Sequence, residues 1–219
     1  RIKETDPSIL VVFGGPNFPL DACRQAEFLK RYREIDIYLR YEGEKAALHL
    51  IRKYLSLDKD IRALKRTELP NASMLDDRGE LVSFPELPRL KDLDEIPSPW
   101  LNGHMDVFFD GKLYPTIQTN RGCPFSCTFC NSGVSGLNKI RNHSVARVTA
   151  DIEYIAEKIQ KTCPLITSMT LADDNFAMYK RDLEIAQVIR DVNTTYGFPR
   201  SISCTTGKNQ KKRVLETIS

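Results

Sequence analysis

Short apolar strands alternate with amphipathic helices along this chain, and this alternation restricts its fold more than any other feature. Towards the N-terminus, the segments at residues 8–13 and 35–39 are predicted strands, each followed by a predicted helix. In the C-terminal half the same order recurs three times, with strands predicted at residues 114–119, 165–172 and 201–206. Strands that alternate with helices form parallel sheets, so we expect an α/β fold.

The sequence divides into three predicted parts. Residues 1–57 hold the first strand–helix pairs, and residues 114–219 hold the three later ones. Residues 58–113 have no long periodic segment and predict a linker with small hairpins. An eight-unit barrel takes about 250 residues, or about 31 per unit, so a barrel built from residues 114–219 would contain about three units and be incomplete.

Charge and hydropathy exclude several classes of protein. The 32 Lys and Arg residues and 29 Asp and Glu residues leave a net charge of +3 spread along the chain, which argues against a nucleic-acid-binding role. The longest aliphatic and aromatic run, Ile9–Phe13, has five residues. That is far below the roughly 20 needed to span a bilayer, and the N-terminus has no signal-peptide pattern. We therefore expect a soluble cytoplasmic protein with reduced thiols and no membrane partner.

The stretch TNRGCPFSCTFCNSG places Cys123, Cys127 and Cys130 within eight residues. A glycine and a proline flank the first of them, which fits poorly with packing of the three side chains in an apolar core. A structural zinc site would need a fourth ligand, and His143 is the nearby candidate. An iron–sulfur cubane held by three thiolates would leave its fourth iron free to bind a substrate or cofactor. The residues alone leave both metal sites open.

The longer string QTNRGCPFSCTFC, directly after a predicted strand, resembles the signature of the radical S-adenosylmethionine (SAM) enzymes. IDIYLRYEGE and EIPSPWLNG also resemble segments that precede the catalytic barrel in the cobalamin-binding members of that superfamily. The resemblance implies that residues 1–57 are the C-terminal part of a Rossmann-like, cobalamin-binding-type domain. It implies that residues 114–219 are the N-terminal half of a radical SAM partial (β/α) barrel.

The resemblance also implies a chemistry. Cys123, Cys127 and Cys130 would ligate a 4Fe-4S cluster that reductively cleaves SAM to a 5′-deoxyadenosyl radical. An external donor such as flavodoxin or ferredoxin would supply the electron. The substrate is unknown, and methylation, cyclisation and rearrangement all remain open. The alternative from another class is a zinc-stabilised binding module that uses the same cysteines and His143.

Five residues outside the cysteines are candidates for contact with SAM by this resemblance. The backbone of Phe129 would lie near the adenine, although its ring could instead pack in the core. Asp173, Asp174 and Asn175 follow the second barrel strand, where a helix N-cap is the alternative role. Lys208 follows the third strand, where a solvated lysine is the alternative.

Cobalamin is an option that these residues do not support. Gly14 and Gly15 match only the last element of the cobalamin-binding pattern, and none of His49, His104 and His143 lies in a D-x-H-x-x-G context. By the resemblance, the chain would begin within the fourth strand of the cobalamin domain and stop after three barrel units. We therefore expect such a fragment to turn over substrate poorly.

Overall fold

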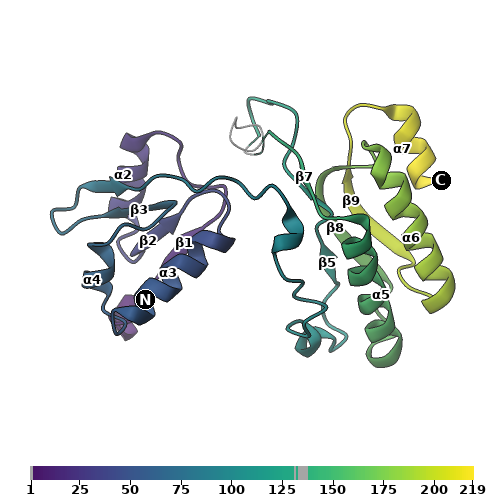
Figure 1. Ribbon diagram of the computed structural model, residues 1–219, viewed down its shortest axis with the longest axis horizontal. Coiled ribbons are helices and arrows are strands. Elements are labelled where there is room, and N and C mark those ends of the chain that lie inside the picture. Colours follow the sequence, from purple (N-terminus) through teal and green to yellow (C-terminus); the bar gives the residue numbers. More distant parts are fainter. Residues whose placement is uncertain (1, 131, 133–137) are drawn as a thin grey trace. The chain divides into compact units, whose positions relative to one another are not determined.

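The computed structural model describes residues 2–130, 132 and 138–219, which fold as two compact units, Arg1–Arg89 and Leu90–Ser219 (Figure 1). This division differs from the expected boundaries after residues 57 and 113. Most of the expected linker belongs to the first unit, because its hairpin pairs with the sheet of that unit.

The first unit is built on a four-stranded sheet in the order β1-β2-β3-β4. Strands β1 and β2 are parallel, whereas β3 is antiparallel to both of its neighbours. The parallel α/β arrangement expected for the first two strands is therefore present, and the hairpin extends it with antiparallel pairing. The elements are α1 (Ile2–Thr5), β1 (Val12–Gly14), α2 (Ala22–Arg31), β2 (Ile37–Leu39), α3 (Glu44–Ser56), α4 (Ile61–Lys65), β3 (Ala72–Leu75) and β4 (Leu81–Ser83).

The core of the first unit explains why the hairpin joins it. Ile37 of β2 and Leu50 of α3 are buried in one cluster with Leu64 and Met74, which come from the expected linker. Burial of each such side chain stabilises the fold by about 1.5–3 kcal/mol relative to leaving it exposed. Apolar residues of the expected linker therefore form part of this core.

The second unit is built on a three-stranded parallel sheet in the order β5-β8-β9. A separate antiparallel pair, β6 and β7, follows β5 in the chain. The parallel sheet confirms the α/β expectation for this half. The elements are η1 (Leu93–Glu95), η2 (Asp106–Phe108), β5 (Thr116–Ile117), β6 (Asn120–Arg121), β7 (Arg141–Asn142), α5 (Val145–Thr162), β8 (Ser168–Phe176), α6 (Lys180–Tyr196), β9 (Ser201–Thr206) and α7 (Lys211–Ile218).

Helix α5 forms where the apolar residues recur at helical spacing. Its N-cap, Ser144, accepts a hydrogen bond from the backbone N–H of Arg147 at 3.0 Å. Val148, Ile152 and Ile155 are buried in the core with Met169 of β8. Helix α6 lies beside α5 along the sheet (Figure 1). The two helices therefore cover the sheet and fix the position of its strands.

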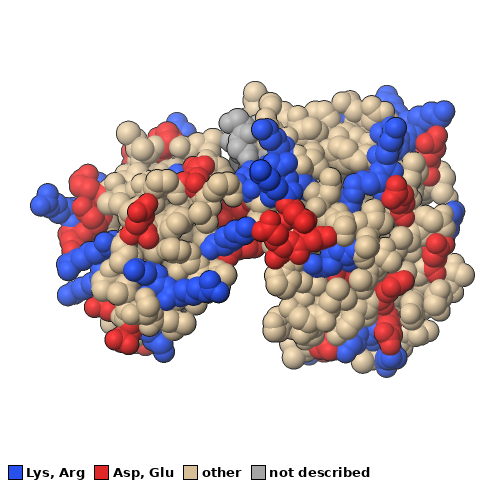
Figure 2. Space-filling model, in the orientation of Figure 1, with Lys and Arg blue, Asp and Glu red and all other residues tan. Residues whose placement is uncertain are grey.

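Charge is mixed over the surface in view. Figure 2 shows Lys and Arg side chains interspersed with Asp and Glu side chains on both units. Among the residues that the structure describes, no helix is both long enough and apolar enough to cross a membrane.

Replacement of Ile155, which is 0% exposed, tests the α5 core. We expect Ile155→Ala to lower the free energy of unfolding by about 2–5 kcal/mol, because it leaves a cavity between α5 and β8. Leu165, which is 93% exposed, offers the matched control, and Leu165→Ala should change stability by less than about 0.5 kcal/mol. Urea denaturation followed by circular dichroism measures both. Equal effects of the two substitutions would contradict this core assignment.

Candidate metal and cofactor site

The cysteine stretch is a loop whose two ends are held together by a short sheet. Strands β6 and β7 pair with Asn120 opposite Asn142 and Arg121 opposite Arg141. The two ends of the loop formed by residues 122–140 therefore lie side by side. Gly122, at the start of the loop, has φ +108°, a conformation that side chains other than glycine rarely adopt. The loop begins directly after β6, five residues beyond the C-terminal end of β5.

The three cysteines of the loop differ in exposure. Cys123 is 3% exposed, whereas Cys127 and Cys130 are half-buried, and all three are free thiols. The backbone N–H of Cys130 donates to the carbonyl of Cys127 at 3.1 Å. Within residues 2–130, 132 and 138–219, no group of three or more His, Cys, Asp or Glu side chains is gathered closely enough to hold a metal ion. The ligand set Cys123, Cys127 and Cys130 therefore stays a prediction.

Asp173 of β8 ties the start of this loop to the sheet. Its carboxylate accepts four hydrogen bonds, from the backbone N–H of Thr119 (2.7 Å), the Thr119 hydroxyl, the backbone N–H of Asn120 (3.2 Å) and the Asn120 amide (2.9 Å). Burial raises the pKa of Asp173, and the hydrogen bonds from Thr119 and Asn120 oppose that rise. Its oxygens face the protein interior, which makes Asp173 a positioning residue in this structure.

Its two neighbours in the strand have different surroundings. Asp174 is exposed, and it accepts a hydrogen bond from the Ser132 hydroxyl at 3.4 Å. Asn175 is 1% exposed and donates from its side-chain nitrogen to the sulfur of Cys123 at 3.2 Å. The side-chain oxygen of Asn175 is buried with no hydrogen-bond partner among the described residues. All three residues lie within β8, not at a helix N-cap, and contact of any of them with SAM stays a prediction.

Lys208 approaches the loop from the turn after β9, whereas Phe129 is part of the loop. The Lys208 ammonium lies 3.5 Å from the sulfur of Cys127 and 5.3 Å from the centre of the Phe125 ring. The hydrogen bond to Cys127 raises the pKa of Lys208. The ring of Phe129 is 89% exposed, so it does not pack in the core. The predicted role of the Phe129 backbone near an adenine is untested.

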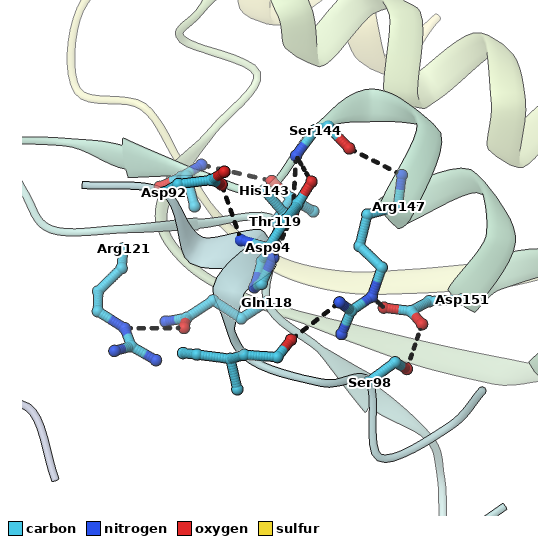
Figure 3. A network of polar contacts seen from close by, with 12 residues as sticks. Asp92, Asp94, Ser98, Gln118, Thr119, Arg121, His143, Ser144, Arg147 and Asp151 are labelled. Atoms are coloured by element: carbon cyan, nitrogen blue, oxygen red, sulfur yellow. Dashed lines mark hydrogen bonds and ion pairs between the residues drawn. The ribbon is translucent and has the colours of Figure 1, made fainter. Parts of the chain in front are cut away.

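His143 belongs to a different network of polar contacts, drawn in Figure 3. Its Nδ1 lies 2.9 Å from a carboxylate oxygen of Asp94, which also accepts the backbone N–H of Ser144 at 3.2 Å. Arg147 extends this network: its backbone N–H donates to the Ser144 hydroxyl, and its Nε lies 3.1 Å from the carboxylate of Asp151. His143 therefore has a carboxylate partner at the start of α5.

Sequence reasoning missed three residues of this site. Arg181 of α6 donates to the Thr119 hydroxyl at 3.2 Å and to the His143 carbonyl at 2.8 Å, which joins both sides of the loop base. The buried hydroxyl of Tyr179 has no partner within the described part of the chain, and burial, followed by the charge of Cys123, raises its pKa to about 12. Asp94 is the third. No local pattern marks Arg181 and Asp94, because their partners lie 38 to 62 residues away in sequence.

Comparison with known proteins shows which enzymes the chain is similar to. No protein-family model matches the chain. It is 33% identical to 2-(S-pantetheinyl)-carbapenam-3-carboxylate methyltransferase of Streptantibioticus cattleyicolor and 32% identical to the cobalamin-dependent radical SAM methyltransferase TokK of Streptomyces tokunonensis. Each alignment covers 98% of this chain and 30% of the relative, so the chain spans about a third of the length of these curated relatives.

Solved structures agree on the fold. The apo form of OxsB, described as a cobalamin-dependent SAM radical enzyme, superposes with a TM-score of 0.64 at 21% identity, over 99% of this chain and 29% of that one. The radical SAM methyltransferase TsrM of Kitasatospora setae gives a TM-score of 0.55 at 16% identity, over 85% and 34% of the two chains. The α/β fold is thus that of cobalamin-dependent radical SAM enzymes. The chain is therefore a relative of methyltransferases that include a cobalamin-dependent radical SAM enzyme.

Substitution of Asp94 tests its contacts with His143 and Ser144. Burial alone would raise the pKa of Asp94, but hydrogen bonds from Ser144 and His143 outweigh burial and lower it. A lowered carboxyl pKa contributes stability above the unfolded value of about 3.9, and this contribution is lost as the pH falls through the folded pKa. We expect Asp94→Ala to reduce the free energy of unfolding at pH 7 by about 1–2 kcal/mol, with the difference shrinking below about pH 4.

Urea denaturation at a series of pH values measures this difference. Asp191, on the exposed face of α6, provides the matched control, because Asp191→Ala removes only a contact with Gln187 one helical turn away. An Asp94→Ala difference that stayed constant from pH 7 to pH 3 would show that the charge of this carboxylate does not stabilise the fold.

Proposed function

We propose that this protein is a radical SAM enzyme of the cobalamin-domain type, with a 4Fe-4S cluster held by Cys123, Cys127 and Cys130. One observation carries the proposal: three free cysteines share a loop whose ends are held by the β6–β7 pair, and β6 follows the C-terminal end of β5, a strand of a parallel sheet. Chemistry in parallel α/β architectures is concentrated at the C-terminal ends of the strands. The predicted ligands occupy that position.

The donors around the loop fit an iron–sulfur cluster. Thiolates are the ligands that iron–sulfur clusters use, and they are deprotonated when they bind metal. Asn175 donates to Cys123 and Lys208 donates to Cys127, so two of the three sulfurs already face groups that favour negative charge. The Asn175 oxygen and the Tyr179 hydroxyl are buried polar atoms with no hydrogen-bond partner in the described part of the chain, as expected beside a site that binds a polar group.

The bound cluster would supply one-electron reduction of SAM. The residues of this chain would position the cluster and shield it. Asp173 and Arg181 hold Thr119 and so fix where the loop begins, which keeps the predicted ligands at the end of the sheet. Burial of Cys123 at this end limits access of water to the first ligand. An external one-electron donor would complete the reaction.

Methyl transfer is the reaction we propose for the whole protein. The two relatives that match 98% of the chain are named as methyltransferases, whereas anaerobic magnesium-protoporphyrin IX monomethyl ester cyclase of Rubrivivax gelatinosus matches only 59%. We propose that the first unit corresponds to part of a Rossmann-like, cobalamin-binding-type domain and the second to the first three units of a partial barrel. Cobalamin would then be a second cofactor of the whole protein, and its methyl acceptor is unidentified.

A zinc-stabilised binding module has less support. It would require the His143 imidazole as a fourth ligand, but His143 pairs with Asp94 at the base of α5. The Nδ1 atom is engaged in that contact, and the relatives above are named as enzymes.

Cysteine substitutions distinguish the two functions. After anaerobic reconstitution with iron and sulfide, the protein should bind about four irons per chain, and Cys123→Ala, Cys127→Ala and Cys130→Ala should each abolish normal cluster loading. Iron and zinc analysis, with the visible absorption spectrum, measures the outcome. Cys23→Ala, Cys163→Ala and Cys204→Ala are matched controls and should load normally.

His143→Ala separates the alternatives, because only the zinc site needs that imidazole. Retention of a normal 4Fe-4S spectrum by Cys127→Ala would contradict the proposed ligand set. Loss of bound zinc in His143→Ala, from a protein that takes up no iron, would favour the binding module.

A further inference from the structure

The C-terminal ends of two neighbouring strands each place one hydrogen-bond donor beside a different cysteine sulfur. Strands β8 and β9 run parallel with Phe176 opposite Thr206. Asn175 immediately precedes Phe176, and Lys208 lies two residues beyond Thr206, in the turn after β9. The side-chain nitrogen of Asn175 is 3.2 Å from the sulfur of Cys123, and the ammonium of Lys208 is 3.5 Å from that of Cys127. The sheet register therefore places both donors beside the loop together.

The packing of Asn175 is not explained by stability of the strand. Asparagine is disfavoured in strands, and this side chain is 1% exposed with its oxygen unpartnered among the described residues. Its nitrogen donates to Cys123, and a thiolate can only accept hydrogen bonds. The amide is thus oriented to stabilise negative charge on this sulfur.

The approach of Lys208 depends on the glycine before it. A Cβ atom on Gly207 would lie 2.5 Å from the Cβ of Met178, so a side chain at this position would force the turn after β9 to move. The backbone N–H of Gly207 also donates to the carbonyl of Phe176 at 2.9 Å. This close turn brings Lys208 to Cys127, where the Phe125 ring lies under its ammonium at 5.3 Å.

We propose that Asn175 and Lys208 are positioning residues that raise the reduction potential of the cysteine-ligated centre. The inference rests on the proposed function, since it requires a cluster on Cys123 and Cys127. Reduction adds one electron, and so one unit of negative charge, to the centre, while no bond to the protein forms or breaks. Hydrogen bonds and positive charge at the ligating sulfurs favour the more negative form. Asn175 is buried and acts without competition from water, whereas the exposed Lys208 is screened by salt.

The test is a redox titration of the anaerobically reconstituted protein with dithionite, followed by visible absorption and electron paramagnetic resonance. We expect Asn175→Ala to retain its iron and to shift the midpoint potential to more negative values. The expected ratio of reduced to oxidised centre at a fixed potential is about tenfold lower, or 59 mV for a one-electron couple. Lys208→Met should shift the potential in the same direction by a smaller amount that declines as salt is added.

Two further variants serve as controls. Asn142→Ala makes the same substitution at an exposed position of β7 and should leave the potential unchanged. Asn175→Ser keeps a hydrogen-bond donor and should recover part of the lost potential.

Normal iron content with unchanged potentials in Asn175→Ala and Lys208→Met would overturn the inference. If Asn175→Ala failed to load iron, Lys208→Met would decide, and an unchanged potential in that variant would overturn it. Failure of the unaltered protein to bind iron would instead overturn the proposed function.

Discussion

The buried carboxylate of Asp173 is the contact on which the site depends. Strands β5 and β8 are parallel with Ile117 opposite Leu171, so Thr119 and Asp173 are each two residues beyond a paired position. At that level the carboxylate accepts hydrogen bonds from both Thr119 and Asn120. A buried carboxylate is costly unless donors surround it, so this segment of chain must stay close to β8. The cysteine loop begins three residues further on.

Arg181 links the start of the loop to the segment that follows its other end. Its guanidinium contacts the Thr119 hydroxyl and the His143 carbonyl, and the backbone N–H of His143 donates to the Thr119 carbonyl at 3.0 Å. Helix α6 thereby connects the strand before the loop with the segment that enters α5. A loop whose two ends are held in this way can present its thiols at one location. The placement of the loop is a property of the sheet and helices around it.

Local patterns were sufficient for much of the fold. The strand predicted at residues 201–206 is confirmed, and a helix, α5, lies before the strand predicted at residues 165–172 and begins at Val145, where Ser144 caps it. The division of the chain was less predictable. The lack of a long periodic segment after residue 57 indicated a linker with small hairpins, but Leu64 and Met74 are buried with Ile37. Antiparallel pairing of β3 with β2 makes this segment part of the first unit. The periodicity of either strand alone does not specify which strand it pairs with.

The sequence by itself determined the chemistry of the site: three thiols at a fixed spacing after a strand, with two aspartates and an asparagine at the end of the next strand. Short-range spacing and residue type carry that information, and the relatedness to radical SAM enzymes follows from it. Only the tertiary structure separated Asp173, which is turned inward, from the exposed Asp174, and brought Asn175 to Cys123. These assignments depend on the register of parallel strands and on burial, and both arise from contacts between residues about 50 positions apart, which no local pattern records.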